Sequence, residues 1–199
     1  ISRQPRRARI SNIDYLDRYE YIGLRHLVTQ GCIFDRQLLY DKFPNQLLPF
    51  DFDTYFQHAE GFEMVTTNCL TGHAMYLSET HDKQRALDIV RASSSLPYVS
   101  KIVNVDGIPM LDGGISDSIP VQHAIDMGYE HNVVILTRNK GWRDHGKDRK
   151  IPYLYKNYPR LRVALSHRHR AYNEQIQLVE ALEAAGKITC IRPIRPLEV

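Results

Sequence analysis

The stretch that decides the fold is Ile102-Val-Asn-Val-Asp-Gly-Ile-Pro-Met-Leu-Asp-Gly-Gly114. Its Asp-Gly pair is a strong two-residue turn signal, so residues 102–105 and 108–111 are predicted to form a β-hairpin. Asp112 then ends the second strand, where a carboxylate lies at a sheet edge that a ligand can approach. Two interpretations are open: Asp112 orients or deprotonates a nucleophile, or it caps a turn that the glycines bend. We expect Gly113 or Gly114 to adopt a backbone conformation that other residues disfavour.

Strands and helices alternate on both sides of this hairpin, a pattern typical of α/β proteins. Residues 62–68 and 73–77 are predicted to form a second hairpin, and residues 132–137 read as a strand buried on both faces of a parallel sheet. Residues 187–192 are a further strand. The predicted helices cover residues 21–28, a segment from 35 that stops at Pro44, and residues 53–61, 82–93, 120–127, 153–166 and 168–185. Residues 1–20 are Arg-rich and weakly periodic, and are expected to be irregular.

The composition is that of a globular chain of 199 residues, with 43% hydrophobic and 25% charged residues. No run of about eighteen apolar residues occurs, which argues against a transmembrane helix. Three widely spaced cysteines favour a reducing, cytoplasmic location over a disulfide framework or a zinc site. The first residue is Ile, so the sequence need not be a whole gene product.

Basic charge is concentrated between residues 138 and 170, which hold eleven Lys or Arg and two acids, a local net charge of +9. Such a segment can face nucleic acid, an anionic membrane or an acidic substrate, or form solvated faces of a loop and a helix. Trp142, the single tryptophan, is a candidate anchor at a membrane interface. We expect contact with an anionic membrane, at its periphery, rather than with nucleic acid.

Nucleophile, metal and cofactor motifs are missing from the sequence. It has no Gly-x-Ser-x-Gly elbow, no Walker loop, no Gly-x-Gly-x-x-Gly and no His-Glu-x-x-His. The hydroxyls of residues 93–95 are expected to cap a helix end, and those of Ser116 and Ser118 to stabilise a local turn. No cofactor and no metal are therefore predicted.

Several short motifs, in this order along the chain, resemble the patatin-like phospholipases. The motifs are Asp14-Tyr-Leu16, Tyr21-Ile-Gly-Leu-Arg25, Phe62, Thr66, Arg91-Ala-Ser-Ser-Ser-Leu-Pro97, Leu111-Asp-Gly-Gly114 and Arg168-His-Arg-Ala-Tyr-Asn-Glu174. Their order is most similar to a bacterial branch with an added C-terminal helical segment. The resemblance implies a mainly parallel central sheet flanked by helices. It also implies a serine acyl hydrolase for lipids or other esters that uses a Ser-Asp dyad, with Asp112 as base and no catalytic histidine.

The chain departs from that family in lacking the elbow serine and the Gly-rich loop. We therefore expect an internal fragment without the N-terminal strands and the elbow, in which residues 1–137 are a partial catalytic domain. Residues 138–199 would be a basic loop and a C-terminal helical extension packed on it. The fragment alone is predicted to be inactive, because the nucleophile precedes it. The alternative is a non-catalytic α/β binding module that uses its basic segment on an acidic partner.

Overall fold

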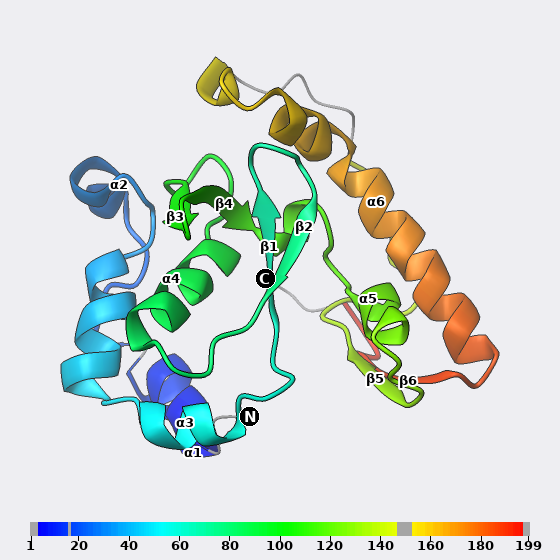
Figure 1. Ribbon diagram of the computed structural model, residues 1–199, viewed down its shortest axis with the longest axis horizontal. Helices are drawn as coiled ribbons and strands as arrows, with labels where there is room; N and C mark the ends of the chain where they lie inside the picture. Colours follow the sequence, from blue (N-terminus) through cyan, green and yellow to red (C-terminus); the bar gives the residue numbers. More distant parts are fainter. Residues whose placement is uncertain (1–3, 16, 147–152, 197–199) are drawn as a thin grey trace. The chain divides into compact units, whose positions relative to one another are not determined.

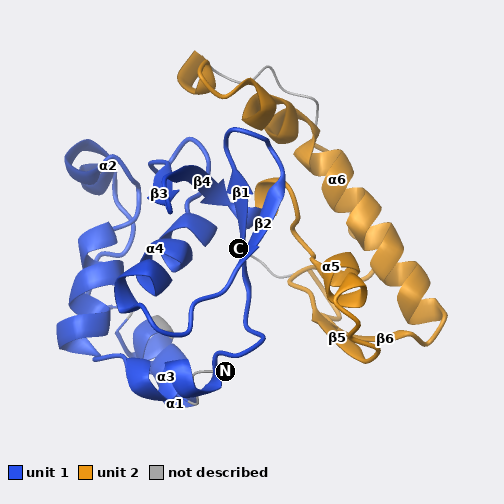
Figure 2. Ribbon diagram, viewed as in Figure 1, with its two compact units in different colours: residues 1–113 blue, residues 114–199 orange. Residues whose placement is uncertain are grey.

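A computed structural model describes residues 4–15, 17–146 and 153–196 of the chain. These residues form two compact units, Ile1–Gly113 and Gly114–Val199 (Figure 2). The division comes directly after Asp112-Gly113, well before residue 138, where the sequence suggested a boundary. Within the described residues, no helix combines the length and the apolar character that crossing a membrane requires.

Unit 1 is built on a four-stranded antiparallel sheet with the order β2-β1-β4-β3 (Figure 1). The strands are β1 (Met64–Asn68), β2 (Ala74–Leu77), β3 (Val103–Val105) and β4 (Ile108–Asp112). Both predicted hairpins are present. Asp106 and Gly107 join β3 to β4 with φ values of 54° and 79°, the left-handed pair that a tight two-residue turn requires.

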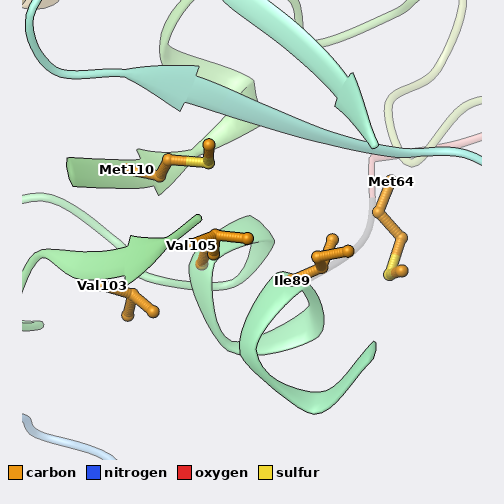
Figure 3. Close-up of a cluster of buried hydrophobic side chains, with 6 residues drawn as sticks. Met64, Ile89, Val103, Val105 and Met110 are labelled. Atoms are coloured by element: carbon orange, nitrogen blue, oxygen red, sulfur yellow. The ribbon is translucent and has the colours of Figure 1, made fainter. Parts of the chain in front are cut away.

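Helix α4 (Lys83–Ser93) covers one face of this sheet, as its apolar periodicity predicted. Asp82 caps its start by accepting hydrogen bonds from the amides of Gln84 and Arg85. The core between helix and sheet consists of buried apolar side chains that point toward one another (Figure 3). They are Met64, Ile89, Ala92, Val103, Val105 and Met110. This core fixes the strand that ends at Asp112.

The first sixty residues are more helical than the sequence suggested. They contain α1 (Pro5–Arg9), the π-helical segment η1 (Ile10–Asp14), α2 (Leu24–Gln30), the π-helical segment η2 (Leu38–Leu47) and α3 (Phe52–His58). The expectation that residues 1–20 are irregular is wrong for residues 5–14, which are helical. Proline is well suited to the first turn of a helix, and Pro5 begins this one. The tyrosines that follow pack on η2. The rings of Tyr15, Tyr19 and Tyr21 lie 5.7–5.9 Å from that of Phe43. Pro44 lies inside η2 and does not end it.

The short 3₁₀ turn η3 (Gly113–Ile115) begins at the last residue of unit 1 and leads into unit 2. Unit 2 then contains α5 (Val121–Asp126), β5 (Asn132–Ile135), η4 (Tyr153–Tyr155), α6 (Pro159–Ala184) and β6 (Ile188–Ile191). The two C-terminal helices predicted from the sequence are one continuous helix, α6. It begins at Pro159, where proline is well tolerated, and no glycine or proline interrupts residues 160–184. Strands β5 and β6 pair in parallel, and their covered face packs with α5 and α6.

The sheets correct two details of the predicted α/β fold. Helices and strands are mixed as expected, but the larger sheet is antiparallel, so a mainly parallel sheet is not confirmed for the described strands. Strand β5 is also not buried on both faces, since Val133 and Ile135 are 63% and 74% exposed. A strand with a single partner strand and helices on one side leaves its other face open, whatever its composition.

Candidate active site at the end of strand β4

Asp112 is the last residue of β4, at the strand end where the sequence predicted it. Its main chain is held from two directions. The Asp112 amide donates to the Ser95 carbonyl at 3.0 Å, and its carbonyl accepts from the Thr67 hydroxyl at 2.8 Å. Asp112 also pairs in register with Thr66, and both threonines are fully buried. The half-buried carboxylate of Asp112 is thus carried on a fixed piece of backbone.

Gly113 is required by close packing and not by its conformation. Neither Gly113 nor Gly114 is among the residues with positive φ, and both belong to the short 3₁₀ turn η3, so the expected unusual conformation is wrong. A Cβ at Gly113 would lie 2.4 Å from the Val65 carbonyl oxygen and 2.7 Å from the Val65 Cβ. The glycine after Asp112 therefore allows β1 to pass directly against the turn.

The three serines at the end of α4 serve the backbone, in line with the sequence-based interpretation. Ser94 donates to the Val90 carbonyl at 2.7 Å, and Ser95 donates to the Arg91 carbonyl at 2.6 Å. Ser93 donates across to the Val65 carbonyl at 2.7 Å, the same carbonyl that abuts Gly113. The hydroxyls of Ser94 and Ser95 thus cap the last turn of α4, and the Ser93 hydroxyl joins this end of the helix to β1 beside Gly113.

Charged groups of unit 1 gather at the opposite end of β4. The Arg85 guanidinium lies 2.8 Å from Glu79 and 2.8 Å from Asp106, which is in the β3-β4 turn. Burial opposes ionisation of Glu79, but hydrogen bonds from the Asp82 amide, from Arg85 and from the amides of His81 and Thr80 outweigh it. Together they lower the Glu79 pKa to about 2. This network stabilises the hairpin and is separate from the Asp112 end.

The basic segment is partly neutralised within unit 2. Arg143 pairs with Glu180 at 2.5 Å. Trp142 is half-buried, with its ring 5.4 Å from that of Tyr172 and the Arg138 guanidinium 4.8 Å above it. The structure thus packs the proposed membrane anchor against α6. Lys147, Arg149 and Lys150 of the basic segment lie outside the described residues.

A cavity of about 440 Å³ lies within unit 1, and no single sequence motif predicted it. Its walls come from α1, η1, η2, α3 and α4, elements spread over nearly ninety residues. Aromatic rings dominate them, among them Phe43, Phe50, Phe52, Tyr55 and Phe62. The only visible signal was the high density of Phe and Tyr between residues 40 and 62.

Metal-binding geometry is not found: within residues 4–15, 17–146 and 153–196, no three His, Cys, Asp or Glu side chains gather as ligands.

The sequence is similar to known proteins over most of its length. The profile of the patatin-like phospholipase family matches residues 2–125, and that of a domain of unknown function, DUF6363, matches residues 158–199. An uncharacterised protein of Escherichia coli K12, YjjU, is 34% identical over 141 residues. That alignment covers 69% of this chain and 39% of YjjU.

Proposed function

Because the chain belongs to the patatin-like phospholipase family, we propose that it is part of a serine acyl hydrolase for lipid or other ester substrates. In this proposal Asp112 is the general base of a Ser-Asp dyad, and the serine and the oxyanion donors precede Ile1. The observation that carries the proposal is the anchoring of Asp112 at the end of β4 by Ser95 and Thr67. A base needs such a fixed position, since small displacements cost large factors in rate.

The proposed chemistry follows from one carboxylate that can hold a proton. The Asp112 carboxylate accepts the serine proton while the serine oxygen attacks the ester carbonyl. Backbone amides stabilise the tetrahedral oxyanion. Collapse expels the alcohol, which takes the proton from Asp112, and an acyl-enzyme remains. Water then attacks this ester while Asp112 takes a proton from it, and collapse of the second tetrahedral intermediate expels the serine oxygen. That oxygen takes the proton back from Asp112, so the carboxylic acid, the free serine and the ionised Asp112 result.

Asp112→Asn in the longer protein that includes the residues before Ile1 tests the proposal. Asparagine keeps the shape but cannot take a proton at neutral pH, so hydrolysis of a p-nitrophenyl ester should fall by about a hundredfold or more. Asp82→Asn is the matched control, because it removes a carboxylate from the same unit while asparagine remains a good N-cap. Circular dichroism of both variants reports on folding.

Two results would contradict the proposal. A folded Asp112→Asn variant with full activity would remove Asp112 from the dyad. Hydrolysis by the 199-residue chain at the rate of the longer protein would place the nucleophile within this chain, with residues 93–95 as the first serines to test. The expected result is turnover by the longer protein only.

We also propose peripheral contact with anionic membranes in the cytoplasm, through the basic segment. Its support is the exposure of Arg160, Arg168 and Arg170 along α6. The 199-residue chain should sediment with anionic vesicles but not with neutral ones, and added salt should release it. Equal, salt-insensitive binding to both kinds of vesicle would contradict this.

A further inference from the structure

The cavity of unit 1 combines an apolar interior with one charged lining residue, Arg7. Its volume of about 440 Å³ is within the range of about 300–1,000 Å³ typical of small-molecule sites. Leu87 and Val90 of α4 add aliphatic surface to the aromatic walls. An unbranched hydrocarbon chain matches this volume and this lining.

Arg7 of α1 is the charged residue in the cavity lining. Its Nη1 donates to the carbonyl oxygens of Leu48 and Pro49, and its Cζ lies 5.0 Å from the centre of the Phe50 ring. Among the described residues, no carboxylate forms an ion pair with Arg7. Burial lowers the Arg7 pKa. Within the part of the chain that the structure describes, this half-buried cation lacks an anion that would offset its lost hydration.

Two other polar side chains of the lining, Tyr21 and Ser11, donate their hydroxyl protons within the protein. The Tyr21 hydroxyl donates to the Ser11 carbonyl at 2.7 Å, and the Ser11 hydroxyl donates to the Arg7 carbonyl at 2.9 Å. Both hydroxyl protons are therefore used within the protein. An arginine has five N–H donors, and the two on Nη1 of Arg7 are engaged. The donors on Nε and Nη2 form the planar fork that binds a carboxylate through two parallel hydrogen bonds.

We propose that this cavity is a binding site for one long-chain monocarboxylate, with the hydrocarbon chain among the aromatic rings and the carboxylate on Arg7. The site goes beyond the proposed hydrolase chemistry and does not depend on it. It selects against a neutral alcohol of equal length, which fills the same volume but leaves the cation unpaired. It also differs from a peripheral membrane contact, because it takes a single molecule.

Displacement of cis-parinaric acid, a fluorescent long-chain carboxylate, from the 199-residue chain tests the site. The probe should bind saturably with one molecule per chain, and dodecanoate below its micellar concentration should displace it. Dodecanol should compete at least tenfold more weakly. Arg7→Gln should weaken binding of the probe by about ten- to a hundredfold, as expected for loss of a charge-assisted hydrogen bond pair.

Matched variants separate the site from general charge and from folding. Arg6→Gln removes an exposed cation of the same helix, outside the cavity lining, and should leave binding unchanged. Val90 lines the cavity and is 41% exposed, so the larger side chain of Val90→Trp should fill the cavity and block binding. Val28 is 86% exposed and lies outside the lining, so Val28→Trp should leave binding unchanged. Thermal unfolding of each variant reports on folding.

The result that overturns the proposal is equal competition by dodecanoate and dodecanol, or equal effects of Arg7→Gln and Arg6→Gln. Absence of saturable binding to the folded wild-type chain overturns it too. Asp112→Asn should bind the probe like the wild type. If Asp112→Asn abolishes hydrolysis and retains probe binding, both the dyad and the carboxylate site are supported. If it retains both hydrolysis and binding, only the dyad is contradicted.

Discussion

Gly113→Ala should destabilise unit 1 although alanine suits a helical turn better than glycine does. The Cβ of an alanine at position 113 would lie 2.4 Å from the Val65 carbonyl oxygen, whereas contacts of a Cβ under 3.0 Å are essentially never observed. The Val65 carbonyl must therefore retreat by more than half an ångström. It cannot do so freely, because Ser93 donates to that carbonyl and β1 is paired on both sides.

The expected magnitude follows from two opposing contributions. Overpacking typically costs about 1–3 kcal/mol, and replacing glycine by alanine in a helical turn returns about 0.5–1 kcal/mol. Because the contact is with backbone, we expect a net loss of about 2 kcal/mol. With a urea m-value of about 2 kcal/mol/M, the unfolding midpoint should fall by about 1 M.

Urea unfolding followed by far-UV circular dichroism measures this change. Fluorescence of Trp142, the single tryptophan, reports on unit 2 in the same samples. Gly107→Ala is the comparator, since its Cβ would meet nothing within 4 Å and its φ of 79° adds only conformational strain, about 1–2 kcal/mol. An unchanged or raised midpoint for Gly113→Ala would refute the close approach of β1 to the turn after Asp112.

Two further predictions concern groups with shifted pKa values. Arg85→Gln should lower the stability of the fold most above pH 5. Folding lowers the Glu79 pKa from 4.5 to about 2, so the ionised Glu79 stabilises the folded state above pH 4.5, and this stabilisation is lost as the pH falls toward 2. Urea midpoints of wild type and variant should therefore converge between about pH 5 and pH 2, and a constant difference would contradict the assignment. Cys69 is fully buried and burial raises its pKa to about 12, so thiol reagents at neutral pH should modify it only after unfolding. Mass-spectrometric mapping of the modified cysteines checks this, with the partly exposed Cys190 as the internal reference.

Local signals in the sequence predicted the hairpins and α4 because each depends on neighbouring residues. Asp106-Gly107 fixes its turn, and Asp82 caps its helix. Predictions failed where distant residues decide. The requirement for glycine at position 113 comes from Val65, nearly fifty positions earlier. The tyrosine rings between residues 15 and 21 pack on Phe43, more than twenty positions later. The exposure of Val133 depends on which face of β5 the helices α5 and α6 cover, which no local pattern records.

The cavity and the Asp112 site share one element, α4, and this decides which variants separate them. Leu87 and Val90 line the cavity, and Ser93, three residues after Val90, donates to the carbonyl beneath Gly113. The two positions are only about 4.5 Å apart along the helix axis. A bulky substitution on α4 can therefore displace the strand end that holds Asp112 as well as fill the cavity. The hydrogen bonds and the ring contact of the Arg7 guanidinium are with Leu48, Pro49 and Phe50, the residues that follow η2, and not with α4. Arg7→Gln should therefore change the cavity without disturbing that strand end.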